Sequence, residues 1–98
     1  MKHELKIYPE FFQAITLGKK TFEVRLNDRN YQCGDVVVLR ECESLPNSPH
    51  SRPNPKYTGR RMVVEITYIM PGGVFGVLSD YIIFSFRICS SYVYINQS

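Results

Sequence analysis

Apolar and polar residues alternate at the start of the chain with the period of two that half-buried β-strands show. Leu5 and Ile7 alternate with Glu4 and Lys6 over residues 3–7. The same period returns at residues 21–26, which predicts a second short strand. Because successive side chains of a strand point to opposite faces, this second strand has two different sides. One carries Phe22, Val24 and Leu26, and the other carries Thr21, Glu23 and Arg25.

Between these two stretches the apolar residues change to helical spacing. Pro9 suits the first position of a helix, and Gly18 suits the position just after its end. We therefore expect one short helix that packs on the core through an aromatic side. The residues of that side are Tyr8, Phe11, Phe12 and Ile15.

Three later stretches also predict strands, at residues 36–40, 61–69 and 81–88. Turn-forming residues separate them at 27–30, 33–35 and 70–73. We expect residues 74–78 to form a bridging turn and residues 92–95 to supply a further short strand. Five or six short strands with one or two short helices predict a single α+β domain over residues 1–98, built as a small, mostly antiparallel β-barrel.

Residues 41–58 differ in composition from the rest of the chain. They hold four of the six prolines, Pro46, Pro49, Pro53 and Pro55, among polar and charged residues. Such a composition predicts a long exposed loop, and long loops in compact domains are often functional. We interpret the segment as a proline-rich loop, with a protein partner as one hypothesis for its role.

Composition and charge narrow the function classes only slightly. The 98 residues carry a net charge of +3, which permits nucleic acid as a partner without requiring it. Three cysteines without CxxC spacing predict neither a disulfide framework nor a zinc site, so we expect no cofactor and no metal. Met1 leads directly into charged residues, and the longest apolar run is too short to cross a bilayer. We therefore expect a cytoplasmic protein that does not associate with membranes.

The stretch LGKKTFEVR, residues 17–25, carries the candidate chemistry. It crowds Lys19, Lys20, Glu23 and Arg25 into seven positions at a helix-to-strand junction. One interpretation is a solvated charge ladder, in which Glu23 and Arg25 pair with a neighbouring strand. The other is the wall of a pocket in which cations bind phosphate and Glu23 accepts hydrogen bonds from a base. Spacing alone leaves both interpretations open.

Three segments of the chain, HELKIYPEFFQAITLGKKTFEVRLNDRNYQCGD, YTGRRMVVEITYI and FGVLSDYIIFSFRI, resemble the DUF3850 family, small bacterial and phage proteins of the ASCH-domain superfamily. The resemblance covers nearly the whole chain except the proline-rich loop and the last ten residues. It departs from the family pattern at Asp80-Tyr81, where Gly-Tyr is usual. It implies a PUA-like β-barrel, a fold that recurs in RNA-binding and RNA-modifying proteins.

In the ASCH picture, the motif lines a cleft between the helix and the barrel. The resemblance therefore implies an RNA or nucleotide-like ligand bound by Lys20, Glu23 and Arg25. Arg29 and Tyr31 are expected at the edge of this site, with Tyr31 available either for stacking on an unpaired base or for packing at the core or rim. Further basic residues would widen the surface: Arg40, Arg52, Lys56, Arg60 and Arg61.

An enzyme is the alternative that the same resemblance raises. Some small ASCH proteins are amidohydrolases of N4-acetylcytidine that use a lysine and a threonine of this motif with a glutamate from elsewhere. Lys20 matches the lysine, but Glu23 stands at the threonine position. Thr21 could replace the missing hydroxyl, and a Lys20–Glu23 pair could activate water. If the chain is an enzyme, its candidate catalytic residues are therefore Lys20, Thr21 and Glu23.

Overall fold

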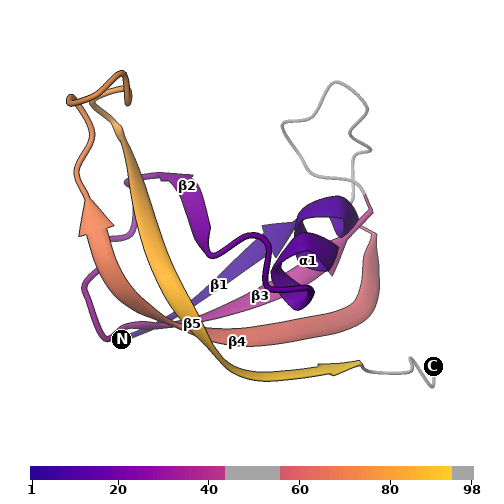
Figure 1. Ribbon diagram of the computed structural model, residues 1–98. Helices are drawn as coiled ribbons and strands as arrows, with labels where there is room; N and C mark the ends of the chain where they lie inside the picture. The colour runs from indigo at the N-terminus through magenta and orange to yellow at the C-terminus, as the bar shows by residue number, and fades with distance from the viewer. Residues whose placement is uncertain (44–55, 94–98) are drawn as a thin grey trace.

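The computed structural model describes residues 1–43 and 56–93. In these ranges the chain forms five strands and one short helix, so the predicted mainly β fold is confirmed (Figure 1). No helix within them combines the length and hydropathy that a bilayer crossing requires. The elements are β1 (Lys2–Ile7), α1 (Pro9–Thr16), β2 (Phe22–Leu26), β3 (Val36–Cys42), β4 (Tyr57–Met70) and β5 (Tyr81–Val93).

The five strands form one sheet in the order β1-β3-β4-β5-β2. β1 runs parallel to β3, and the other three pairings are antiparallel. The sheet curls into a half-barrel, with α1 inside the curve (Figure 1). The first two strands of the sequence are therefore the two edges of the sheet, brought round towards each other by its curvature.

β4 and β5 are much longer than the sequence pattern predicted. They contain 14 and 13 residues and pair along most of their length. Their register shifts between Val63 and Val64 and again between Ile66 and Tyr68. Such irregularities bend a strand and increase its twist, which explains the strong curvature of this hairpin. Residues 92 and 93 belong to β5, so the prediction of a separate strand is wrong for these two residues. Residues 94–95 lie outside the described ranges.

The ends of the predicted proline-rich loop belong to the sheet. Glu41 and Cys42 extend β3, Tyr57 begins β4, and Cys42 pairs with Tyr57. The prediction of a loop over residues 41–58 is therefore wrong at both ends. Residues 44–55, which contain all four prolines of the segment, lie outside the described ranges.

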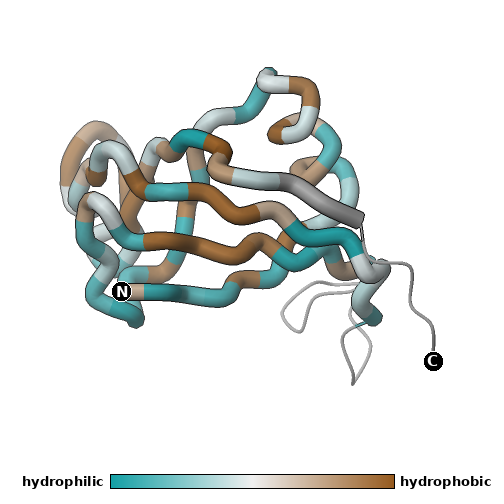
Figure 2. Tube along the Cα trace, turned by 90° about the horizontal axis from the view of Figure 1, so that it is seen from below, coloured by the Kyte–Doolittle hydropathy of each residue, from teal (hydrophilic) through white to brown (hydrophobic). Residues whose placement is uncertain are grey.

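The core fills the space between the concave side of the sheet and α1. Figure 2 shows hydrophobic stretches on adjacent strands of the sheet. α1 contributes Phe12 and Ile15, which are buried, and it ends where Gly18 adopts a φ of +75°. The strands contribute mainly Leu5, Ile7, Val37, Leu39, Met62, Val64, Ile66, Ile82, Phe84 and Phe86.

Arginine side chains connect the two edge strands. Arg25 of β2 donates a hydrogen bond from Nη2 to the Lys6 carbonyl of β1, at 2.8 Å. Arg29 donates from Nη1 to the Glu4 carbonyl, at 2.7 Å. These carbonyls are two residues apart and therefore point to the same side of β1, away from β3. The gap between the sheet edges is thus bridged by guanidinium groups instead of a β-ladder.

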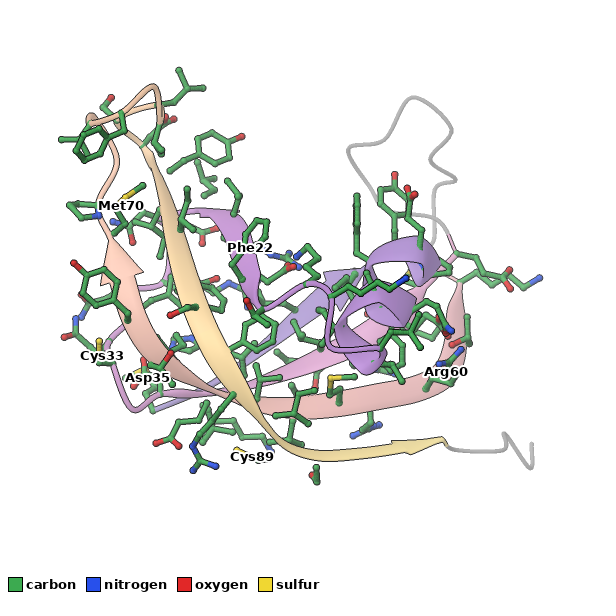
Figure 3. All side chains as sticks on the ribbon, viewed as in Figure 1. Phe22, Cys33, Asp35, Arg60, Met70 and Cys89 are labelled. Carbon is green, nitrogen blue, oxygen red and sulfur yellow. The ribbon has the colours of Figure 1, made fainter. Side chains whose placement is uncertain are left out.

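A buried carboxylate joins the start of β3 to β1. Asp35 accepts hydrogen bonds from the Gln32 backbone N–H at 3.0 Å and from the terminal amine of Met1 at 3.0 Å. Its Oδ2 lies 2.8 Å from Nε2 of His3, whose ring is also buried. These contacts fix the first residue pairs of the parallel ladder between β1 and β3 (Figure 3).

Candidate ligand-binding cleft

The charged side of β2 faces the interior of the half-barrel. Glu23 is only 5% exposed, whereas Phe22, Val24 and Leu26, on the other face of the strand, are 45–49% exposed. Phe22 and Val24 reach the cavity at the edge of the strand. The alternation in the sequence correctly separates these two sides. It is unusual that the polar side is the inner one, because an ionised group is costly to bury unless it is paired.

Two cations close to Glu23 in the sequence supply that pairing. Lys20 Nζ contacts Oε2 of Glu23, while Arg25 donates to Oε1 from Nε at 3.0 Å and from Nη2 at 2.7 Å. The partners therefore lie on β2 and just before it, and not on a neighbouring strand. The interpretation as a solvated charge ladder is wrong, because the carboxylate is buried and its partners are local.

The turn between α1 and β2 positions the Lys20 ammonium. The Lys19 and Lys20 backbone N–H groups both donate to the Ala14 carbonyl, which wraps the chain back over the end of the helix. Lys20 Nζ also donates to the Phe22 carbonyl and lies 4.9 Å from the centre of the Phe22 ring. It lies 5.7 Å from the centre of the Phe11 ring. The ammonium is therefore held between a carboxylate and two aromatic rings, an arrangement that adds cation–π attraction.

These groups line a cavity of about 350 Å³ between the end of β1, the start of α1 and the free edge of β2. Figure 3 labels Phe22 on β2, the strand that forms one wall. The volume is at the lower end of the range for small-molecule sites, about 300–1,000 Å³. The lining consists of aromatic and aliphatic side chains with one carboxylate and three cations: Lys6, Ile7, Tyr8, Phe11, Lys20, Phe22, Glu23, Val24 and Arg25.

The hydrogen bonds inside the cluster leave defined positions for a ligand. Lys20 has three N–H donors, of which Phe22 and Glu23 occupy two. Arg25 uses Nε and Nη2 within the described part of the chain, which leaves the two N–H groups of Nη1. The Glu23 carboxylate has about four acceptor positions, of which three are filled. The cleft therefore offers mainly donors, on a cluster with an excess of positive charge.

Residues 2–86 match a family model described as "Domain of unknown function (DUF3850)". The chain belongs to the DUF3850 family. This confirms the family predicted from the three matching segments of the sequence. The LGKKTFEVR stretch lies inside the matched range, so the cleft is built from residues that the family model covers.

A relative of this DUF3850 chain is the "Uncharacterized 12.9 kDa protein in GpA 3'region" of Escherichia phage P2. The two are 34% identical over 65 residues, which is 66% of this chain and 50% of the relative. The matched region therefore spans half the length of the phage protein. Its printed description states no ligand and no activity.

Three sequence-predicted residues of this DUF3850 chain lie outside the cavity lining. Thr21 is exposed, and Arg29 lies further along the gap, bonded to Glu4 and 3.7 Å from Asp28. Tyr31 is buried, with its ring centre 4.7 Å from that of His3 and 5.4 Å from that of Phe84. Burial raises the pKa of Tyr31, although the nearby arginines oppose this. The interpretation of Tyr31 as a stacking platform is therefore corrected to core packing.

Three of the additional basic residues, Arg40, Lys56 and Arg60, contact neighbours that do not line the cavity. The Arg40 guanidinium lies 3.7 Å from the centre of the Tyr57 ring and covers one face of that ring. Arg60 lies over the Phe12 ring at 4.6 Å and 3.6 Å from Glu41 (Figure 3). Lys56 pairs with Glu43 at 3.3 Å, and Arg52 lies outside the described ranges. The described members of this group therefore do not extend the cleft.

Sequence reasoning missed the aromatic wall of the cleft. It assigned Tyr8 and Phe11 to the core together with Phe12 and Ile15, but Phe11 is exposed and both Tyr8 and Phe11 line the cavity. The spacing gave no signal of this, because positions 8, 11, 12 and 15 follow the i, i+3, i+4, i+7 pattern of a single helix face. Burial differs within that face, since Phe12 and Ile15 are buried and Phe11 is 41% exposed.

The described cysteines do not line the cleft. Cys33 and Cys89 are exposed and Cys42 is buried, and no disulfide joins them. Within the described ranges, no three His, Cys, Asp or Glu side chains lie close enough together to hold a metal ion. The polar groups that line the cleft belong to lysine, arginine, glutamate and tyrosine side chains.

Proposed function

We propose that this DUF3850 domain binds RNA or a nucleotide-like ligand in the cleft between α1 and the edge strands, as a PUA-like module of the ASCH type. The observation that carries the proposal is the buried Glu23 carboxylate, which holds Lys20 and Arg25 beside an aromatic wall. A carboxylate held between two cations orients their remaining donors towards the cavity. Such prearranged donors match phosphate oxygens, and aromatic rings match the faces of bases.

In the proposed complex, the free N–H of Lys20 and the Nη1 donors of Arg25 bind an anionic oxygen of the ligand. A base packs on Phe11 and Phe22, and the remaining acceptor position of Glu23 receives an exocyclic amine. Lys6 adds a third cation to the cavity lining. The donors outnumber the acceptors, so the cleft favours a ligand that carries negative charge over a neutral nucleoside.

The geometry supports only part of the amidohydrolase alternative, because it joins Lys20 to Glu23 but leaves out the hydroxyl group. Thr21, the candidate hydroxyl, is exposed and does not line the cavity. Lys20 donates to Glu23 and to the Phe22 carbonyl, so two of the three N–H groups of its ammonium are already occupied. We therefore propose a binding module and no enzyme.

Replacing Lys20 by Ala is expected to weaken nucleotide binding by about 10- to 100-fold, because a hydrogen bond to a charged group contributes about 1.5–3 kcal/mol. Lys19→Ala is the matched control, since Lys19 is the neighbouring residue, is exposed and does not line the cavity. Isothermal titration with the four nucleoside monophosphates and with short RNA oligonucleotides measures both variants. Affinity should also fall as salt rises if phosphates are contacted.

Two results would contradict the proposal: wild type binding none of these ligands, or Lys19→Ala and Lys20→Ala losing affinity equally. The second result would assign any binding to general positive charge. Incubation of wild type with N4-acetylcytidine, followed by chromatography for cytidine and acetate, tests the hydrolase alternative in the same preparation.

A further inference from the structure

The connection between β4 and β5, residues 71–80, presents apolar side chains to solvent. We refer to these residues as the hairpin tip. Phe75 is 92% exposed and Leu78 is 66% exposed, and Val74 is also on the surface. Figure 1 shows the hairpin tip projecting beyond the rest of the sheet, on the side away from α1. An aromatic residue at this exposure contributes nothing to the core, so another explanation for its position is needed.

The hairpin tip holds Phe75 in a fixed and strained conformation. Phe75 has a φ of +51°, a region that bulky residues disfavour. Hydrogen bonds from Gly73 to Val77 and from Val77 to Val74 close the turn around it. A Cβ on Gly72 would lie 2.2 Å from the Tyr81 carbonyl oxygen and 2.3 Å from that of Leu78, so the base of the turn is tightly packed backbone. Strain of this kind is concentrated at functional sites in proteins.

The apolar surface of the hairpin tip continues onto the outer face of the sheet. The cross-strand register places Met70 of β4 beside Ile83 of β5, and Ile83 beside Val24 of β2. Leu26 lies opposite Tyr81 in the next row. Val24 and Leu26 are both exposed. The result is a continuous uncharged surface, which is typical of interaction sites when it exceeds a few hundred Å².

The charge distribution decides what kind of partner this surface fits. All twelve Lys and Arg residues lie outside residues 62–86, where the only charged residues are Glu65 and Asp80. Glu65 pairs with Arg87, whereas Asp80 is exposed as the last residue of the hairpin tip. A surface without cations and with an exposed carboxylate is a poor match for nucleic acid or for an anionic membrane. It complements a protein pocket with an apolar floor and a basic rim.

We propose that the hairpin tip is a docking element for another protein, which receives Phe75 in an apolar pocket and pairs a basic rim residue with Asp80. Buried aromatic anchors dominate the binding energy of many protein interfaces. Because the turn is already fixed, little conformational entropy is lost when it docks. The two contact residues of this proposal, Phe75 and Asp80, do not line the cavity, although Val24 of the adjoining apolar surface does.

Site-specific photocrosslinking identifies the partner. The full chain carries the photoreactive residue p-benzoylphenylalanine at position 75, or at the exposed position 19 as a control, in the cells that naturally produce the protein. We expect one discrete protein adduct from position 75 that is absent from position 19. The adduct is identified by mass spectrometry, and that protein is then purified for titration with wild type, Phe75→Asn and Asp80→Asn.

The proposal predicts that Phe75→Asn weakens binding of the purified partner by at least 30-fold and that Asp80→Asn weakens it by about 3- to 10-fold. In the crosslinking experiment, the proposal is overturned by no adduct from position 75, or by an adduct only with a second copy of the chain, with lipid or with RNA. In the titration, it is overturned by equal binding of Phe75→Asn and wild type. An adduct only with a second copy would identify the hairpin tip as a self-association surface.

Phe75→Asn also has a predicted effect on the free protein, which separates docking from folding. Asn tolerates the left-handed backbone region better than Phe, and the Phe75 ring makes almost no contact with the fold. We therefore expect Phe75→Asn to raise the melting temperature by about 2–5 °C. Calorimetry checks this, and a lower melting temperature would show that Phe75 stabilises the fold.

Discussion

Glu23→Gln is expected to lower the free energy of unfolding by about 2–4 kcal/mol and the melting temperature by about 10 °C or more. The substitution keeps the size of the side chain but removes the charge that Lys20 and Arg25 share. Their side chains are only 17% and 22% exposed, so both cations would lose their counter-ion where water replaces it poorly. Arg25 would also lose the carboxylate that orients it towards Lys6, which weakens the link between β1 and β2.

Glu4→Gln is the matched control for this experiment. Glu4 also pairs with an arginine, Arg40 at 3.1 Å, but its side chain is more than half exposed. Exposed ion pairs contribute little, so the free energy of unfolding should change by less than about 0.5 kcal/mol. Urea denaturation of the two variants gives the comparison directly. Equal, small losses for both would mean that the Glu23 cluster does not stabilise the fold.

Acidification below pH 4 is expected to weaken the fold through Asp35. Burial raises the pKa of Asp35, but hydrogen bonds from His3, the terminal amine and the Gln32 N–H outweigh it and lower the pKa from 3.8 to about 2. The unfolded chain therefore takes up this proton at a higher pH than the folded chain. The stabilisation is complete above about pH 4 and is lost as the pH falls through about 2, with a size on the order of 2 kcal/mol.

Asp35→Asn isolates this contribution. We expect the variant to be less stable than wild type by about 2–3 kcal/mol at pH 6, because a buried, hydrogen-bonded charge is lost. The difference should shrink as the pH falls from 4 to 2, where wild type loses its own charge. Urea unfolding at several pH values measures it, with the exposed Asp28→Asn as a control that should follow wild type. A difference that stays constant with pH would contradict the assignment.

The period of the hydrophobic pattern was sufficient to predict where β1, α1 and β2 lie, because each is a local and regular segment. It could not predict which side of β2 faces inward. Burial of the Glu23 side depends on pairing with Lys20 and Arg25, and alternation carries no information about that. The same pattern assigned the whole aromatic side of α1 to the core, although the fold leaves Phe11 at a cavity.

The sheet itself was predicted less well than its strands. The parallel pairing of β1 with β3 joins residues more than thirty positions apart. Turn residues predict which neighbouring strands form a hairpin, but they carry no information about a pairing of this kind. The lengths of β4 and β5 were underestimated because the register shifts interrupt the alternation without ending the strands. Single-sequence patterns report local geometry, whereas these features arise from contacts between distant segments.

The residues of the candidate site also fall into those that the sequence could predict and those that only the fold brings together. Lys20, Glu23 and Arg25 could be grouped from the sequence because they lie within six residues. Lys6, Tyr8 and Phe11 reach the same cavity only because β1 and β2 are the two edges of a curled sheet. Arg29 and Tyr31 were included for their chemistry, and the fold places one further along the gap and the other in the core.

The strand order β1-β3-β4-β5-β2 has a consequence for how the protein acquires its cleft. β3, β4 and β5 are consecutive in the chain and pair as antiparallel neighbours, so they can assemble while the chain is still largely open. The first 26 residues supply both outer strands, which pair with this centre at its opposite edges. The cavity walls come from this N-terminal segment alone. A ligand that bound the cleft would therefore stabilise the packing of the first 26 residues on the centre of the sheet.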